Sequence, residues 1–275
     1  MKGQIIKIVS NDYFVLCDKK TYICKSRGKF RVENITPQVG DYVFFDIENK
    51  YILEILPRKN SLLRPNVSNI DQAFIVTSLK EPNFSDYLLD KLLVVCLSNN
   101  IKPVICFTKK DLLNKNEYKK IKQYIKYYKK LGFKVIFNTD IFKIKRLFKN
   151  KTTVFTGQTG AGKSSLMNKL DKSLNFEVNE ISKALGRGKH TTRYVTLVNL
   201  YNGKVLDTPG FSAIDLSNLS DEEIRKSFID FDKYNCLYDN CMHINEKECE
   251  VKKAVMSGKI LSSRYENYKK IIEKR

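Results

Sequence analysis

Short stretches in which apolar and polar residues alternate fill the first part of the chain. They read GQIIKIVS, DYFVLCD, TYICKSRGKFR, VGDYVFFDI and YILEILPR, and they are separated by turn-forming residues. Alternation with a period of two indicates strands with one buried face, and several such short strands are typical of a small β-barrel. The next stretch, RKNSLLRPNVSN at 58 to 69, contains proline and asparagine and predicts a linker.

From residue 71 onwards, continuous apolar runs alternate with segments of helical period. The runs AFIVTSL, PVICF, KVIFNT and TTVF are typical of buried parallel strands, and YLLDKLLVVCLSNN, NEYKKIKQYIKYYKKLG and DIFKIKRLFKN between them predict helices. For the helix at 116 to 132, Asn116 is the candidate N-cap and Gly132 the candidate C-cap. Residues 71 to 217 are therefore predicted to form one α/β domain.

Length and composition indicate a globular protein with two or three domains, since the chain has 275 residues and 42% hydrophobic residues. No apolar run approaches the roughly 18 residues of a membrane span, and MKGQIIKIVSND lacks the apolar core of a signal peptide. Seven cysteines, an odd number, favour a reducing compartment. We expect a cytoplasmic protein without a membrane partner, with four cysteines in hydrophobic cores: Cys17, Cys24, Cys96 and Cys106.

Positive charge is concentrated in the middle of the chain. The net charge of +20 results from 50 basic and 30 acidic residues, and between 115 and 151 the only acidic residues are Glu117 and Asp140. Such a surface attracts phosphate backbones and predicts salt-dependent nucleic-acid binding. RGKFR at 27 to 31 is consistent with a loop that grips a nucleic-acid backbone. In both places a merely solvated, lysine-rich surface is the alternative.

The stretch TGQTGAGKSS contains the phosphate-loop pattern G-x-x-x-x-G-K-S between a predicted strand and a predicted helix. In such a loop, backbone N–H groups converge on phosphate oxygens, the lysine reaches the β and γ phosphates, and the serine hydroxyl binds Mg²⁺. The sequence therefore predicts a nucleoside-triphosphate site formed by Gly157, Gln158, Thr159, Gly160, Ala161, Gly162, Lys163, Ser164 and Ser165, with Ser164 as a magnesium ligand.

The stretch FTKKD follows the predicted strand PVICF and resembles the N/T-K-x-D motif with which GTPases read guanine. The Asp111 carboxylate would accept two hydrogen bonds from guanine, which adenine cannot donate, and the Lys109 stem would cover the ring. Thr108 stands where asparagine is commoner, and Lys110 completes the motif. The expected nucleotide is therefore GTP.

Two further motifs follow the phosphate loop. In DTPG, at 207 to 210, Asp207 would hold Mg²⁺ through water and the Gly210 amide would contact the γ-phosphate. In GRGKHTTRYVTL, at 186 to 197, Thr191 or Thr192 would complete the magnesium shell. The base reader thus precedes the phosphate loop, whereas in ordinary GTPases it comes last. This order predicts a circularly permuted domain.

The C-terminal segment begins with a capping box, SDEE at 220 to 223, which predicts a helix to about Phe231. Cysteines and one of the two histidines then form the pattern C-x4-C-x-H-x5-C. This set is typical of a closed tetrahedral zinc site in a segment too small to be stable alone. We expect one Zn²⁺ per chain, with an iron–sulfur cluster as the alternative, and a core separate from the nucleotide site; the ligands would be Cys236, Cys241, His243 and Cys249.

Over nearly its full length the chain resembles the RsgA (YjeQ/YloQ) family, on the motif order above and on RPNVSNIDQ, GRGKHTT, EVKKAV and RYENYKKIIEK. The resemblance implies a multidomain α/β protein: an OB-fold RNA-binding domain (1–66), a circularly permuted P-loop GTPase domain (71–217) and a helical zinc-binding domain (218–275). It also implies a protein that binds the 30S ribosomal subunit and 16S rRNA, hydrolyses GTP to GDP and phosphate with ribosomal stimulation, and assists late small-subunit maturation. We expect this protein to be a monomer.

The chain departs from the family pattern where a Ser-Ala-Lys-like loop usually contacts the guanine carbonyl. Here the residues are Asn138, Thr139 and Asp140, whose backbone amides could still make that contact. The contribution of these three residues to guanine binding stays open.

The group that orients the attacking water is the least defined part of the site. Position 211 is Phe, where many GTPases have glutamine, so His190 is the candidate catalytic residue beside Lys163. A histidine that contacts rRNA or packs the loop is the alternative. Two rival functions also stay open: an RNA-binding scaffold without turnover, and a GTPase of the large subunit.

Overall fold

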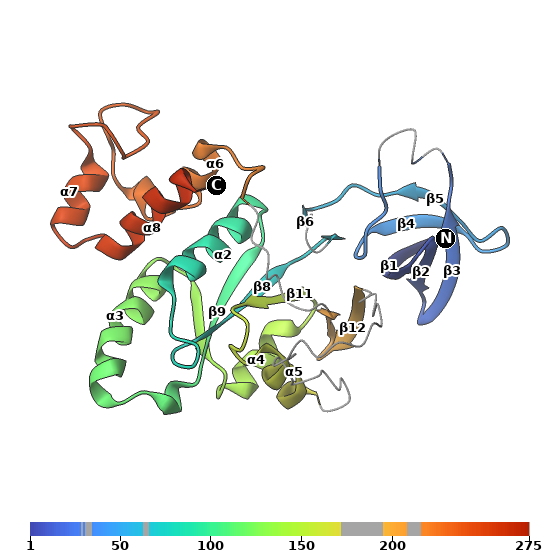
Figure 1. The fold of residues 1–275 in the computed structure, drawn as a ribbon. Coiled ribbons are helices and arrows are strands. Elements are labelled where there is room, and N and C mark those ends of the chain that lie inside the picture. Colours follow the sequence, from blue (N-terminus) through green and yellow to red (C-terminus); the bar gives the residue numbers. More distant parts are fainter. Residues whose placement is uncertain (29, 31–34, 63–65, 172–194, 208–215, 275) are drawn as a thin grey trace, which may run out of the picture. The chain divides into compact units, whose positions relative to one another are not determined.

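The computed structural model describes residues 1–28, 30, 35–62, 66–171, 195–207 and 216–274 (Figure 1). The chain divides into two compact units: Met1–Ala73 with Ile141–Phe155 and Ser164–Phe211, and Phe74–Asp140 with Thr156–Lys163 and Ser212–Arg275.

The N-terminal part of the first unit is a closed five-stranded barrel, as the alternating pattern predicts. Its strands are β1 (Lys2–Val9), β2 (Asp12–Cys17), β3 (Lys20–Ser26), β4 (Tyr42–Asp46) and β5 (Tyr51–Ile55). They pair in the order β1-β2-β3-β5-β4, and a further β1–β4 pairing closes the barrel. Ile5, Val15 and Phe45 are fully buried and belong to one hydrophobic cluster, so the alternate residues of each strand form the barrel core.

The described residues of the predicted linker include regular secondary structure. The linker contains two short paired strands, β6 (Ser61–Leu62) and β7 (Val67–Ser68). Arg58 donates to both carboxylate oxygens of the buried Asp41, at 2.7 and 2.8 Å, and the Ser68 hydroxyl donates to the same carboxylate at 2.6 Å. A buried carboxylate needs such partners, and they hold this segment against the barrel.

The rest of the first unit contains β11 (Thr152–Gly157) beside the hairpin of β12 (Thr196–Leu200) and β13 (Gly203–Asp207), together with α4 (Ile141–Phe148) and α5 (Lys163–Leu170). β11 runs parallel to β13, and β12 pairs antiparallel with it. β12 includes residues 196 and 197, the last two of the stretch GRGKHTTRYVTL, which was expected to be a loop around the magnesium site. Pairing with β13 makes them part of a strand instead.

In the second unit β10 (Lys134–Phe137), β9 (Lys102–Thr108) and β8 (Gln72–Ser78) are neighbours, and β9 and β10 run parallel. The helices are α2 (Asp86–Ser98) and α3 (Lys115–Lys130). The predicted N-cap of α3 was wrong: it is Asn114, whose side chain and that of Glu117 form a reciprocal capping box. Leu131 is the C-cap, and Gly132 follows it with a φ of 93°.

The C-terminal part of the second unit contains α6 (Asp221–Lys226), a 3-10 turn η3 (Phe231–Lys233), α7 (Glu250–Met256) and α8 (Ser262–Glu273). The capping box of Ser220 and Glu223 is confirmed, but α6 ends at Lys226 rather than near Phe231. The Ser227 hydroxyl donates to the Glu223 carbonyl, a bond that competes with the continuing helix. Within the described ranges, no helix combines the length and apolar character needed to cross a membrane.

The buried core of the C-terminal helices contains none of the described residues of the predicted nucleotide site, as expected, but it extends to α2. Phe228, Phe231 and Tyr268 lie in one buried cluster with Val94 of α2, and Tyr87 and other partly buried side chains pack against it. Figure 1 shows α6 and α8 beside α2. The C-terminal segment is therefore part of the same packed body as α2.

Candidate guanine-nucleotide site and metal cluster

The phosphate loop joins β11 to α5, in the strand–loop–helix context that the motif requires. Its glycines have left-handed backbones, with φ of 132° at Gly157, 74° at Gly160 and 90° at Gly162. A Cβ on Gly157 would lie 1.9 Å from the Val76 carbonyl oxygen of β8, so only glycine fits there. The backbone of the loop therefore packs closely against β8, and its glycines leave room for a ligand to approach the backbone.

Lys163 opens α5 and points back into the loop. Its Nζ donates to the carbonyl oxygens of Gly157, at 3.0 Å, and Gln158, at 2.9 Å. Ala161 is fully buried and its N–H donates to the Gln158 carbonyl, whereas Thr159 and Gly160 are exposed. Ser164 and Ser165 follow as the next two residues of the helix. The loop is thus shaped by its own hydrogen bonds, with its tip open to solvent.

The guanine-reading motif FTKKD lies at the end of β9, where Thr108 is buried with 1% of its surface exposed. Its hydroxyl donates to the Ala161 carbonyl of the phosphate loop at 2.7 Å, and its own carbonyl accepts from the Leu79 N–H. Threonine therefore makes the connecting hydrogen bond in the position where asparagine is commoner. The structure brings the two motifs, 53 residues apart in sequence, into direct contact.

The other residues of the motif differ in their surroundings. Lys109 has a φ of 55° and its Nζ donates to the Glu81 carbonyl. Lys110 points elsewhere, with its ammonium over the rings of Tyr118, 4.7 Å from the centroid, and Phe137, at 5.1 Å. Asp111 lies in the 3-10 turn η1 (Lys110–Leu112) and is exposed. Lys110 thus supports the motif, and the Asp111 carboxylate is open to a ligand.

The loop at 138 to 140 lies beside the end of β9. The Asn138 N–H donates to the Phe107 carbonyl at 2.9 Å, and the Asp140 N–H donates to the Phe137 carbonyl. The backbone N–H groups of Asn138 and Asp140 therefore already donate hydrogen bonds to backbone carbonyls. The exposed Thr139 lies between these two residues.

The remaining predicted nucleotide residues are described only in part. Asp207 is the last residue of β13, and its side chain lies outside the described residues. Gly210 and Phe211 after it also lie outside them, as do the candidate magnesium ligands Thr191 and Thr192 and the candidate water-orienting residue His190.

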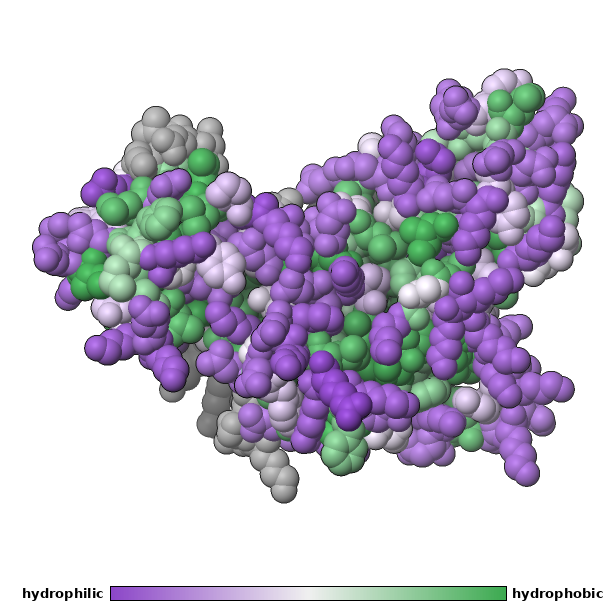
Figure 2. Space-filling model, turned by 180° about the vertical axis from the view of Figure 1, so that it is seen from behind, coloured by the Kyte–Doolittle hydropathy of each residue, from purple (hydrophilic) through white to green (hydrophobic). Residues whose placement is uncertain are grey.

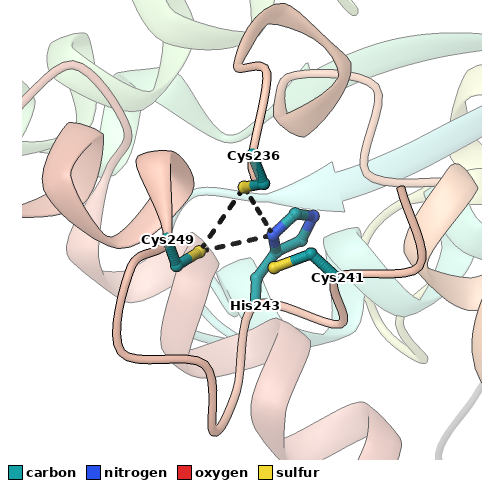
Figure 3. A group of neighbouring side chains, drawn as sticks. All are labelled: Cys236, Cys241, His243 and Cys249. Carbon is teal, nitrogen blue, oxygen red and sulfur yellow. Dashed lines mark hydrogen bonds between the residues drawn. The ribbon is translucent and has the colours of Figure 1, made fainter. Parts of the chain in front are cut away.

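The four predicted metal ligands converge, and their ligand atoms all lie within 4.8 Å of one another (Figure 3). The Sγ atoms of Cys236 and Cys249 are 3.8 Å apart, and His243 Nδ1 lies 3.5 and 3.4 Å from them. Tetrahedral zinc with bonds of about 2.3 Å to sulfur and about 2.0 Å to nitrogen requires separations near 3.8 and 3.6 Å. The Cys3His donor set and the spacing of Cys236, Cys249 and His243 fit a zinc ion.

The protonation of the histidine also suits a metal. Burial lowers the pKa of His243 to about 4, so the imidazole is neutral at neutral pH, the form that binds metal. Burial raises the pKa of Cys241 to about 12, so that thiol must lose its proton when it becomes a ligand.

The loops that carry the ligands are fixed by buried hydroxyl groups. Tyr265 donates to the His243 carbonyl at 2.6 Å and Tyr268 donates to the Met242 carbonyl at 2.7 Å. The Phe231 ring lies edge-on to the His243 ring, with centroids 5.4 Å apart. Helix α8 and η3 therefore hold the cluster in place.

Sequence reasoning missed a buried ionic network between α8 and the nucleotide-binding part of the second unit. Arg264 is 2% exposed and donates to the carboxylates of Asp230, at 2.9 Å, and Asp90 of α2. Tyr127 and Tyr128 of α3 donate to the same two carboxylates, each at 2.7 Å. No local motif marks these residues, because the Arg264–Asp90 pair is 174 positions apart.

The closed barrel, the phosphate loop tied to a guanine-reading motif that precedes it, and the C-terminal Cys3His cluster define a circularly permuted GTPase with two additional modules. A family model described as the RsgA GTPase matches residues 55–217, and one described as the RsgA N-terminal domain matches residues 2–52. The chain therefore belongs to the RsgA GTPase family, as its resemblance implied, and is a GTP-hydrolysing enzyme.

Individual relatives and solved structures agree with this assignment. "Small ribosomal subunit biogenesis GTPase RsgA 2" of Oceanobacillus iheyensis is 46% identical over 282 residues, which cover 99% of this chain and 96% of the relative. The crystal structure of YloQ, described as a circularly permuted GTPase, matches with a TM-score of 0.83 and 36% identity over 99% of this chain and 93% of that one. YjeQ from Thermotoga maritima gives a TM-score of 0.83 and 32% identity, covering 100% and 99%.

Proposed function

We propose that the chain binds GTP with the phosphate loop and FTKKD and hydrolyses it during late maturation of the small ribosomal subunit. The observation that carries this proposal is the hydrogen bond from Thr108 to Ala161, because it sets the guanine reader beside the phosphate loop within one compact unit. Asp111 reads the base edge, Lys109 covers the ring, and the loop amides with Lys163 bind the phosphates.

Two metals complete the proposal. Mg²⁺ accompanies GTP and is held by Ser164, by Thr191 or Thr192, and by Asp207 through water; it neutralises charge that develops on the phosphates. One Zn²⁺ binds the Cys3His cluster, whose interatomic distances suit it. Its role there is structural, since all four positions are filled by protein ligands.

The ribosomal partner follows from the relatives, which are named small ribosomal subunit biogenesis GTPases. We assign the contact with 16S rRNA to the barrel and to the exposed face of α3. On α3, Lys119, Lys122, Lys126 and Lys129 are exposed. Figure 2 shows hydrophilic side chains over most of the visible face, including the region of α3 at the lower right. The positive charge of the exposed α3 lysines would attract phosphate backbones.

We further propose the domain division 1–66, 71–217 and 218–275, a monomeric protein, and a cytoplasmic location. The matched ranges of the two family models support a boundary near the end of the barrel. The second boundary lies within the second compact unit, where α2 shares a core with the C-terminal helices.

The proposal is tested by GTP turnover alone, with purified 30S subunits and with 50S subunits. We expect stimulation by 30S only, and cosedimentation with 30S that weakens as salt rises, because rRNA binding releases counterions. Stimulation by 50S would assign the enzyme to the large subunit, and negligible turnover on either subunit would favour a scaffold.

A variant of His190 separates catalysis from binding. If His190 orients water once the ribosome has ordered its loop, His190→Ala keeps nucleotide affinity and slow intrinsic turnover but loses most of the 30S-stimulated rate. The variant should still cosediment with 30S in the presence of a non-hydrolysable GTP analogue. Loss of cosedimentation would instead assign His190 to rRNA contact.

A further inference from the structure

The segment between β8 and α2, Leu79–Ser85, has no role in any of the motifs, yet it contacts the nucleotide site. The Glu81 carbonyl accepts the hydrogen bond from Lys109 Nζ. Glu81 and Lys109 both have left-handed backbones, with φ of 56° and 55°. The segment therefore meets the lysine that is assigned to cover the guanine ring.

Two interactions at Lys80 hold the first part of this segment in place. Lys80 forms an ion pair with Glu117, with Nζ 3.0 Å from the nearer carboxylate oxygen and both side chains about one-third exposed. The backbone N–H of Asn114 and then the Lys80 ammonium lower the pKa of Glu117, so this partner is charged at neutral pH. The Ser78 hydroxyl donates to the Lys80 carbonyl at 2.6 Å.

Aromatic packing fixes the other end of the segment. The Phe84 ring lies edge-on to Phe107, the residue before Thr108, with centroids 5.9 Å apart, and to Tyr124 of α3 at 5.2 Å. On the side of the phosphate loop, Pro82 Cδ lies 3.6 Å from the position of a Cβ on Gly160. The segment thus lies against both halves of the nucleotide site.

We infer that residues 79 to 85 are a positioning element of the guanine site, which holds the Lys109 ammonium on the Glu81 carbonyl so that the lysine stem is fixed before the base arrives. The inference rests on the proposed role of Lys109. Lysine is rich in rotamers, and a side chain that is already ordered loses less entropy when a ligand binds. The element therefore increases affinity without reading the base edge.

This role predicts a particular pattern of nucleotide affinities. Guanine and hypoxanthine have the same ring face for a lysine stem to cover, but hypoxanthine lacks the exocyclic amine that a carboxylate reads. Loosening the segment should therefore weaken the binding of GDP and the binding of inosine diphosphate by the same factor. A change at Asp111 should alter the ratio between them.

The experiment uses the full chain with GDP and inosine diphosphate as probes, and fluorescence titration gives both dissociation constants. Lys80→Met removes the ion pair and Phe84→Leu removes the ring contacts, and each should raise both constants about 3-fold to 10-fold with an unchanged ratio. Lys80→Arg, which can keep the ion pair, should restore affinity. Asn83→Ala, at an exposed side chain of the same segment, is the matched control.

Lys109→Ala in the same assay distinguishes failure of this inference from failure of the proposed role of FTKKD. If Lys109→Ala weakens both nucleotides while Lys80→Met and Phe84→Leu do not, the inference is overturned and the site assignment stands. If Lys109→Ala has no effect, the assignment of FTKKD fails as well. A changed ratio of the GDP and inosine diphosphate dissociation constants in the Lys80 or Phe84 variants would also overturn the inference. Equal thermal unfolding midpoints of the variants and the unaltered protein exclude misfolding as the cause.

Discussion

The guanine-reading motif, the phosphate loop as far as Lys163 and the Cys3His cluster lie in the same compact unit, but the nucleotide motifs and the cluster are built from different kinds of group. At the proposed nucleotide site Asp111, the expected base reader, and Thr159 at the loop tip are exposed, and backbone carbonyls accept the supporting hydrogen bonds. In the cluster Cys241, His243 and Cys249 are buried side chains. Recognition groups at the surface can be exchanged with little effect on folding, whereas buried ligands are part of the core.

The surroundings of the two sites extend this contrast. The cluster lies among aromatic residues of a core shared with α2, and next to it Arg264 joins two buried carboxylates. A buried charge that loses its partner is costly, so the C-terminal region should respond to mutation as one cooperative body with α2. The barrel has its own core in the first unit and should be unaffected.

The largest effect is expected from loss of the metal. Cys241→Ser should remove most zinc affinity and destabilise the C-terminal region by on the order of 5 kcal/mol or more, since structural zinc binds with about 10–16 kcal/mol. Hydrogen exchange should show lost protection in α6 to α8 and also in α2, because they share a core. β1 to β5 should keep their protection.

Elemental analysis of freshly purified protein gives the control, with one zinc per chain for the unaltered protein and less for the variant. Iron instead of zinc would contradict the assignment. Unchanged protection in α2 would show that the shared core does not couple the two regions.

The second effect concerns the buried ionic network. Arg264→Met leaves Asp90 and Asp230 buried without their cation and should lower the free energy of unfolding by about 3–5 kcal/mol. Chemical denaturation measures this loss. Lys269→Met on the same helix, where Lys269 forms a partly exposed pair with Glu266, should cost at most about 1 kcal/mol. Equal losses of unfolding free energy in the two variants would contradict the contrast between a buried ionic network and an exposed ion pair.

The phosphate loop and the metal cluster could each be predicted from sequence because the residues of each lie close together along the chain. The spacing of the cysteines and His243 within 14 residues restricts the ligand geometry, and the phosphate loop is one uninterrupted turn between a strand and a helix. The capping box at Ser220 and Glu223 was predicted for the same reason. At α3 the same i, i+3 pattern favours Asn114 over Asn116, because only Asn114 has a glutamate three residues later.

The contacts that join these motifs could not be predicted, because they form between residues that are close in the folded structure but distant in sequence. The bond from Thr108 to Ala161 spans 53 positions, and the pair of Arg264 and Asp90 spans 174. No periodicity encodes such partners. The contact of Glu81 with Lys109 is equally hidden, because its acceptor is a backbone carbonyl and any residue type could supply it.

A smaller effect should follow from cutting the bond between the two nucleotide motifs. Thr108→Val keeps the shape of the side chain but removes its hydroxyl, which leaves the buried Ala161 carbonyl without that donor. Loss of about 1 kcal/mol corresponds to roughly fivefold weaker binding of both GDP and GTP. Thr108→Ser keeps a hydroxyl and should bind like the unaltered protein. If both variants bind equally well, the bond does not support the site.

The smallest effect on folding should come from Asp111, the residue proposed to read the base. Asp111 is exposed, so Asp111→Asn should change the free energy of unfolding by less than about 0.5 kcal/mol. Its effect on recognition should be large, because an amide cannot accept two hydrogen bonds from guanine but can pair with the altered edge of xanthine. Competition between GTP and xanthosine triphosphate should therefore shift toward xanthosine triphosphate. An unchanged preference would remove FTKKD from the site, while a large loss of stability would erase the contrast between an exposed reader and a buried metal ligand.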